Sequence, residues 1–302
     1  MPHHRKPRAG RWREAGVGAA LLLAALAPSA SAFESTPPGT SVHDQATAAA
    51  ATPLGWSGSG LDALQQAVRA PDLAESKVKG SAGHLVVVDA VGDYEPAHHC
   101  DRLPPTPNAQ AFAATTAYVR LERDEALQFA RTGHPERAVT ALGRALHALQ
   151  DCHSHSNVVD LGPAVQARFQ QELLAGGGLP DGLVLTGFQP GEEQADMPPG
   201  DPYPHGLHAK DGTNSTPDAE ARLPDGRTKF EAALALAAAT TQSFLADVLA
   251  HLNATERRDL LGVSPQHAKN WALPPPAVPT LIALLAAGVA LRRRSSAAPP
   301  GR

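Results

Sequence analysis

AVTALGRALHALQDCHSHSN, residues 138–157, joins a helical pattern of Ala and Leu to a polar end that carries three histidines, an aspartate and a cysteine. Within it, His147, Asp151 and His155 follow one another at intervals of four residues. At 100° per residue, this spacing places the three side chains within about 80° of one another on one helix face. Pro135 is a favourable first-turn residue, so the helix is expected to begin there. The segment therefore predicts a long helix that directs metal-binding side chains into one cleft.

The spacing also bears on how many metal ions the helix would serve. His147 and His155 are eight residues apart, which corresponds to about 12 Å along a helix axis. This is near the limit that two imidazoles can span to one tetrahedral ion with bonds of about 2.0 Å. More than one ion is therefore favoured, with Asp151 as a bridging carboxylate, and His and Asp ligands with open positions suit catalytic zinc. The alternative is an ordinary solvated helix end, where the same spacing also occurs.

Ala-rich segments with helical periodicity dominate the rest of the chain, and convincing alternating strands are absent. Helices are predicted over 61–70, 108–131, 135–157, 163–175 and 230–252. The two longest consecutive helices are joined by a short turn and should pack antiparallel. The Val-rich segment 84–91 is ambiguous between a strand and a buried helix, and the aperiodic loop 179–226 is long enough to suggest a role in the site. The expected fold is all-α, with a single helical domain over 33–270.

Both ends of the chain carry the features of export signals. Residues 1–32 combine a basic start, an apolar run and a small-residue end, which indicates a signal peptide cut before Phe33. Residues 271–302 combine a Pro-rich segment, an apolar run over 280–291 and an Arg cluster, and they resemble the PEP-CTERM-type sorting tails of exported Gram-negative proteins. A plain membrane anchor is the alternative, although a full span needs about 20 apolar residues. We therefore expect an exported protein of the periplasm, outer surface or medium, with or without an anchor.

Charge and cysteine content narrow the expected partners. Removal of residues 1–32 takes away five Lys or Arg residues and one Glu, so the formal net charge moves from −4 to −8. An acidic chain opposes non-specific binding to nucleic acid, which makes nucleic acid the less favoured substrate. Cys100 and Cys152 are the only cysteines. In an exported protein, this count predicts one disulfide.

The segment 138–157 resembles the helix of the zinc-dependent phospholipases C and their single-strand nuclease relatives. In that family a His, an Asp four residues later and a further His supply ligands to a three-zinc cluster. More specifically, the segment resembles the HET-C-like branch, whose pattern is LHxLxD followed by HSN. This sequence has Leu146-His147, Asp151 and His155-Ser156-Asn157 at the corresponding positions.

Two upstream segments share the resemblance. VGDYEPAHHCD, residues 91–101, is similar to the family's Asp-Tyr segment and to the His that lies three residues before an Asp, here Asp93, His98 and Asp101. AFESTPPGTSVHDQAT, residues 32–47, resembles the family's opening, in which the first residue's amine and carbonyl and a nearby His bind metal. The resemblance thus implies a set of ligands: Phe33, His43, Asp93, His98, His147, Asp151 and His155. His99 replaces His98 if the register slips by one residue.

The last ligands implied by the family depart from its pattern. The phospholipases end their set with a His and a Glu four residues later, but here Arg227 stands four residues before Glu231. His208 and Asp211 of the HAKD segment are the favoured replacements, with Glu231 as the alternative.

The function implied by the resemblance is phosphodiester hydrolysis with two or three zinc ions. Clustered zinc polarises phosphoryl oxygens and lowers the pKa of bound water. Asp93 is the proposed carboxylate that orients this water and accepts its proton. The expected substrate is a phospholipid or another phosphodiester, with membrane association through the C-terminal tail. The alternatives are a nuclease or phosphatase of the same fold, and a non-catalytic surface protein stabilised by metal. Because Cys100 and Cys152 each lie beside a proposed ligand, their disulfide would tie two ligand segments together.

Overall fold

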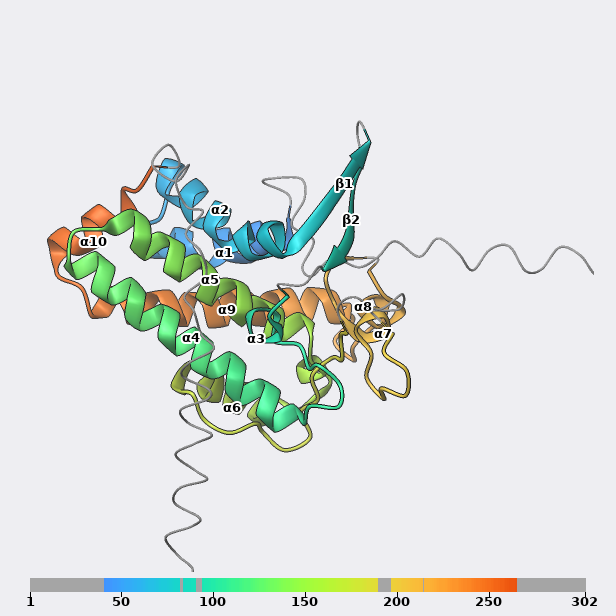
Figure 1. Cartoon of the computed structure of the whole chain (residues 1–302). Helices are drawn as coiled ribbons and strands as arrows, with labels where there is room; N and C mark the ends of the chain where they lie inside the picture. Colours follow the sequence, from blue (N-terminus) through green and yellow to red (C-terminus); the bar gives the residue numbers. More distant parts are fainter. Residues whose placement is uncertain (1–40, 82–83, 91–93, 190–196, 214, 265–302) are drawn as a thin grey trace, which may run out of the picture.

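The computed structural model describes residues 41–264 except 82–83, 91–93, 190–196 and 214 (Figure 1). The predicted signal peptide, the predicted C-terminal tail, Phe33 and Asp93 lie outside these residues.

The described chain is mainly helical. Its elements, in order, are α1 (Val42–Ala51), the 3-10 helix η1 (Thr52–Leu54), α2 (Gly58–Glu75), β1 (Ser76–Ser81), β2 (His84–Ala90), α3 (Pro96–His99), α4 (Asn108–Arg131), α5 (Pro135–Ser154), the 3-10 helix η2 (Val158–Asp160), α6 (Pro163–Ala175), α7 (His205–His208), α8 (Pro217–Glu220), α9 (Lys229–Ala250) and α10 (Ala254–Leu261). The helices predicted from periodicity lie within or close to α2, α4, α5, α6 and α9. The expectation of a mainly helical fold is confirmed.

Helix α5 occupies the centre of the body and packs against α2, α4 and α9. Every residue from Ala145 to Ser154 is fully buried, including the polar side chains. This burial excludes the solvated helix end that the sequence left open. Water cannot satisfy these polar groups, so they must bond to one another or to a ligand.

One glycine allows α2 to lie unusually close to α5. A Cβ atom at Gly143 would lie 2.4 Å from the Cβ atom of Ala67 and 2.6 Å from its carbonyl oxygen. Any larger residue at 143 would therefore push α2 outward. This contact matters for the site because α2 and α5 both carry residues of the polar centre described below.

The described part of the chain also forms one antiparallel hairpin, in which Val78 pairs with Val87 and Gly80 with Leu85. It stands out from the helical body beside the end of α2 (Figure 1). The hairpin resolves the ambiguous Val-rich segment as a strand, and it is an addition to a body that is otherwise helical, as expected. Its first strand is short and mixes Lys, Val, Gly and Ser, so it carries little periodic signal.

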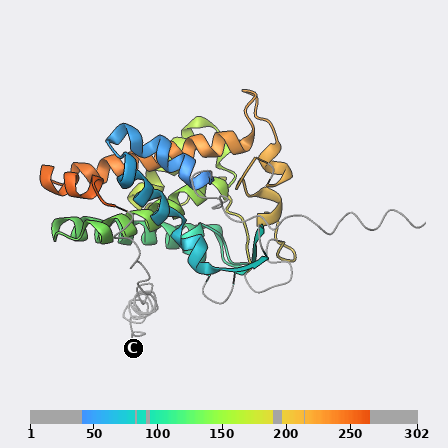
Figure 2. The same cartoon turned by 90° about the horizontal axis from the view of Figure 1, so that it is seen from above.

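The short elements gather at one end of the molecule. The hairpin, α3, α7 and α8 lie at this end, opposite α10 (Figures 1 and 2). Helix α5 runs from the opposite end toward them, so its polar C-terminal half reaches the short elements.

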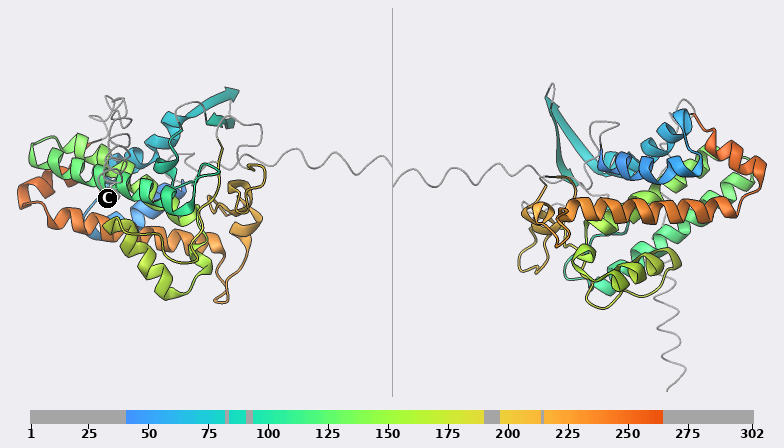
Figure 3. Two further views of the ribbon diagram at one scale, coloured as in Figure 1. Left: turned by 60° about the horizontal axis from the view of Figure 1, so that its bottom comes forward. Right: turned by 180° about the vertical axis from the view of Figure 1, so that it is seen from behind.

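Helix α9 extends along the face seen from behind (Figure 3). Among the described residues, it is the one helix long and apolar enough to cross a membrane by length and composition. Within its most apolar window, 44% of the residues are buried inside the molecule. Because α9 packs against both α5 and α1, its apolar character also fits a core helix.

Candidate metal centre

Five buried side chains converge around the middle of the C-terminal half of α5. We call them the first cluster; they are His43 of α1, Asp72 of α2, His99 of α3, and His147 and Asp151 of α5. Asp72 has 11% side-chain exposure, whereas the other four side chains are between 0 and 3% exposed. The first cluster is therefore closed on nearly every side and approaches solvent at Asp72.

The distances within the first cluster suit metal chelation. His147 Nε2 lies 3.1 Å from Asp151 Oδ2 and 3.4 Å from Asp72 Oδ1. His99 Nδ1 lies 3.2 Å from Asp151 Oδ2 and 3.1 Å from His147 Nε2. Two donors bonded to one tetrahedral zinc ion are themselves about 3.3 Å apart. The cluster therefore fits the spacing that a zinc ion requires.

Asp151 directs its two oxygens to different histidines. Its Oδ2 faces His99 and His147, while its Oδ1 lies 3.4 Å from His43 Nε2. This division is the arrangement needed for a carboxylate that serves two ions.

The orientation of His43 is fixed from outside the cluster. Gln150 Nε2 donates to the hydroxyls of Thr47 at 3.0 Å and Thr241 at 3.3 Å, which leaves Gln150 Oε1 to accept. That oxygen lies 2.7 Å from His43 Nδ1, so Nδ1 carries the proton. The lone pair on His43 Nε2 is consequently directed at Asp151, as expected of a metal ligand.

A second polar group lies just beyond the C-terminal end of α5. We call it the second cluster; it consists of Asp101, His155, His205 and Asp211. His155 Nε2 lies 3.0 Å from Asp211 Oδ1 and 3.1 Å from His205 Nε2, and His205 Nε2 lies 3.5 Å from Asp211 Oδ2. These separations again match two donors on one zinc ion.

Buried charges set the protonation of both clusters. Burial opposes protonation of His155, but the carboxylates of Asp101 and Asp211 outweigh it and hold the pKa of His155 well above its usual value. Burial likewise opposes ionisation of Asp101, yet His155 and His205 lower the pKa of that carboxyl to about 2.

His147 and Asp151 show the same relationship in the first cluster. Burial opposes the charge on each, but the carboxylates of Asp151 and Asp72 raise the pKa of His147. The histidines beside Asp151, with His147 foremost, hold its pKa well below its usual value. The carboxylates of Asp101, Asp151 and Asp211 are thus ionised, and negative charge of this kind attracts a cation.

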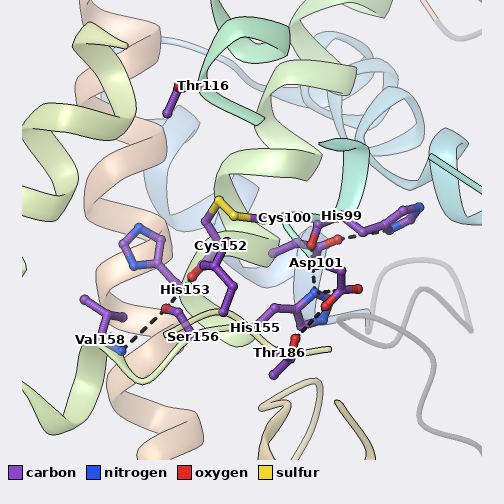
Figure 4. Close-up of a disulfide and its surroundings, with 12 residues drawn as sticks. His99, Cys100, Asp101, Thr116, Cys152, His153, His155, Ser156, Val158 and Thr186 are labelled. Atoms are coloured by element: carbon purple, nitrogen blue, oxygen red, sulfur yellow. Dashed lines mark hydrogen bonds and ion pairs between the residues drawn. A yellow bond between two sulfur atoms is a disulfide. The ribbon is translucent and has the colours of Figure 1, made fainter. Parts of the chain in front are cut away.

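The disulfide lies between the two clusters. Cys100 and Cys152 are buried and bonded, with Cα atoms 5.0 Å apart (Figure 4). The predicted pairing is therefore present. It joins α3, which supplies His99, to α5, and Asp101 follows directly after Cys100.

Two of the predicted histidines lie outside the clusters, and a nearby histidine occupies the expected place of each. The ring of His98 lies against Tyr118, with centroids 4.2 Å apart, while His99 enters the first cluster. The register that favoured His98 is corrected to the alternative, His99. Consecutive residues of the single-turn helix α3 point in directions about 100° apart, so only one of them can face α5.

The HAKD segment shows a similar correction. His208 stacks on Tyr203 at 3.9 Å and lies 3.8 Å from Asp218, whereas His205 enters the second cluster beside Asp211. The two histidines are the first and last residues of α7, and it is the first, His205, that faces His155. Asp211 lies in the cluster as expected.

Glu231 is occupied elsewhere. It is exposed and forms the capping box of α9 with Thr228: the Glu231 carboxylate accepts from the Thr228 amide, and the Thr228 hydroxyl accepts from the Glu231 amide. Glu231, the alternative last ligand, therefore lies outside both clusters.

Two residues of the clusters, Asp72 and His205, were not among the predicted ligands. Asp72 follows Pro71, and its only sequence signal is that it lies within the polar end of a helix. His205 had the better signal, because HGLHAKD places two histidines near an aspartate.

No protein-family model matches this chain, and no curated protein or solved structure matches it. The fold and the site define a mainly helical protein with two buried His–Asp clusters that could hold metal ions. This conclusion rests on the chain's own side chains.

Proposed function

We propose that the protein is a zinc-dependent phosphodiester hydrolase of the phospholipase C-like, HET-C-like kind, with two or three ions. The observation that carries this proposal is the placement of both clusters along one buried helix, with Asp151 directing one oxygen to His43 and the other to His99 and His147. The resemblance in residues 138–157 supports the same activity.

The donor set fits zinc. His43, Asp72, His99, His147 and Asp151 would hold the ions of the first cluster, and His155, His205 and Asp211 would hold the other. Bound zinc supplies Lewis acidity toward phosphoryl oxygens and a lowered pKa for coordinated water. Nitrogen and carboxylate donors without thiolates are usual at catalytic zinc sites.

Asp72 is suited to act on the attacking water. It is the member of the first cluster that approaches solvent, at 11% side-chain exposure. A carboxylate in this position can orient a water molecule and accept its proton. Asp93, the residue implied by the resemblance for this role, lies outside the described residues, and its role stays a prediction.

Two exposed apolar side chains favour a lipid over a nucleic acid. Leu73 is 50% exposed and follows Asp72, while Leu207 is 42% exposed and lies two residues after His205. Apolar side chains beside a polar site suit an amphiphilic substrate. The acidic net charge of the chain opposes binding to nucleic acid.

The second candidate is a non-catalytic protein that metal stabilises. Its support is the near-complete burial of the ligands, since structural zinc sites are closed. A measurement of hydrolytic activity distinguishes this candidate from the proposed hydrolase.

The test is metal analysis of the purified protein, followed by hydrolysis assays on phosphatidylcholine vesicles, single-stranded DNA and bis(p-nitrophenyl) phosphate. We expect two or three zinc equivalents and zinc-dependent hydrolysis of phosphatidylcholine. Asp151→Asn should lose more than one equivalent together with activity, because a bridging carboxylate serves two ions. The matched control is Asp247→Asn, which removes an exposed carboxylate paired with Arg123. Zinc-loaded protein that hydrolyses none of the three substrates would favour the structural role.

A further inference from the structure

The carboxylate of Asp101 is held by two hydroxyl groups. Thr186 Oγ1 donates to Asp101 Oδ1 at 2.5 Å, and the Tyr94 hydroxyl donates to Asp101 Oδ2 at 2.5 Å (Figure 4 shows the Thr186 bond). Asp101 Oδ2 also lies 3.4 Å from His155 Nδ1. Asp101 is 2% exposed, so these groups take the place of solvent.

The contacts of His155 identify its metal-facing nitrogen. His155 Nδ1 lies 2.7 Å from the carbonyl oxygen of His99. A carbonyl oxygen only accepts, so Nδ1 carries a proton and cannot bind a metal ion. The other nitrogen, Nε2, is the one that faces His205 and Asp211. Asp101 therefore approaches His155 from the side opposite to the metal-facing nitrogen.

We propose that Asp101 is a positioning residue, which orients His155 from outside the coordination sphere and is not itself a ligand. A carboxylate beside the protonated nitrogen of a ligating histidine fixes the ring orientation and raises the basicity of the other nitrogen. The competing arrangement groups Asp101 with His155 and His205 as direct ligands.

Tyr94, which donates to Asp101, also contacts the first cluster. Its ring stacks on His99 with centroids 4.8 Å apart and planes 8° apart. One residue thus contacts a proposed ligand of the first cluster through its ring and the positioning carboxylate of the second through its hydroxyl.

The inference rests on the proposed metal-binding function of the second cluster. The test distinguishes a failure of the positioning role from a failure of metal binding itself. Zinc content and zinc affinity, measured by chelator competition, are compared for the wild-type protein, Asp101→Asn and the ligand variant Asp211→Asn. The matched control is Glu122→Gln, which removes the charge of a buried α4 carboxylate that pairs with Arg144 of α5. Cobalt-substituted protein provides a visible absorption spectrum that reports the coordination number.

We expect Asp101→Asn to keep every ion at saturating zinc, to keep the cobalt coordination number, and to bind one ion about 10- to 100-fold more weakly. Asp211→Asn should lose that ion, and Glu122→Gln should match the wild type. The inference is overturned if Asp101→Asn loses an ion outright or changes the cobalt coordination number, because Asp101 would then be a ligand. Wild-type affinity in Asp101→Asn would overturn it as well.

Tyr94→Phe keeps the proposal testable if Asp101→Asn does not fold. It removes one hydrogen-bond donor to Asp101 and should lower the affinity for the same ion by a smaller factor than Asp101→Asn does. An unchanged affinity would count against the proposal. A wild-type protein that binds no zinc overturns the proposed function itself. A wild-type protein that binds zinc, with variants unchanged, overturns only the positioning role.

Discussion

Cys100 and Cys152 join α3 to α5 beside the proposed metal ligands, with Cα atoms 5.0 Å apart. Each cysteine has a proposed ligand as its immediate neighbour, His99 before Cys100 and Asp151 before Cys152. Those neighbours meet, because His99 Nδ1 lies 3.2 Å from Asp151 Oδ2. The disulfide thus brings the two ligands together independently of any ion, and a bond of this kind suits an oxidising compartment.

Replacement of both cysteines by serine should destabilise the protein and weaken metal binding together. The disulfide links residues 52 positions apart, and a loop of this size contributes about 3 to 4 kcal/mol by the loop-entropy model. Urea unfolding of the metal-free protein measures the first effect, and zinc affinity measures the second. Wild-type zinc affinity in the double variant would show that the ligands converge without the bond.

Adjacent histidines provide a matched pair for testing the first cluster. His99→Ala should lose zinc, because His99 Nδ1 lies within 3.2 Å of donors on both His147 and Asp151. His98→Ala should keep its zinc, because the His98 ring lies against Tyr118. Metal analysis of the two variants decides between the registers. Loss of zinc from His98→Ala alone would restore the original assignment.

Gly143 is predicted to be intolerant of substitution. In Gly143→Ala the new methyl group would meet Ala67 at 2.4 Å, so α2 must shift and take Asp72 with it. Overpacking of this kind costs about 1 to 3 kcal/mol. Gly178→Ala is the control, since its methyl group would meet no atom within 4 Å. Equal unfolding free energies for the two variants would contradict the close approach of α2 to α5.

The sequence was sufficient for the long helices and for the histidines and aspartate of α5, because these features depend on local periodicity. It was insufficient for Asp72. A proline inside a helix costs about 3 kcal/mol, so the helix was expected to end before Pro71, yet α2 continues through it to Glu75. The choice between His98 and His99 depends on which side of a one-turn helix faces α5. The presence of His205 in the second cluster, in place of His208, depends on how the chain around α7 approaches His155. Tertiary contacts, and not local spacing, decide that.

The metal-free and zinc-loaded proteins should respond oppositely to pH. The pKa values of His147 and His155 are raised, since neighbouring carboxylates outweigh the effect of burial. Folding then favours the protonated rings, so this stabilisation is complete below the ordinary value of 6.5 and is lost as pH rises through the raised folded-state pKa values. Zinc must displace these protons, so its stabilising effect increases over the same range.

Thermal unfolding from pH 6 to about pH 9 measures this difference. We expect the melting temperature of the metal-free protein to fall over this range and the gap to the zinc-loaded protein to widen. His43 and His153 have lowered pKa values, chiefly because of burial. Their effect on stability therefore falls below the ordinary value of 6.5, and not in the alkaline part of this range. A gap that stays constant or narrows would show that His147 and His155 do not release protons to the metal.

Leu73 and Leu207, which neighbour cluster residues in the sequence, should affect the hydrolysis of lipid aggregates and not that of soluble esters. Leu73 and Leu207 are 50% and 42% exposed, next to Asp72 and near His205. Replacing both by serine should lower hydrolysis of phosphatidylcholine vesicles by roughly tenfold. Full burial of a leucine contributes about 1.5 kcal/mol or more, and each of these side chains, already about half buried, would gain about half of that in a lipid surface. Hydrolysis of bis(p-nitrophenyl) phosphate should be unchanged, as that substrate offers no acyl chain. The control is Leu121→Ser, which removes a leucine of 39% exposure from α4, outside both clusters. An equal loss on both substrates would indicate damage to the metal centre, and no loss on either would place the lipid-binding surface elsewhere.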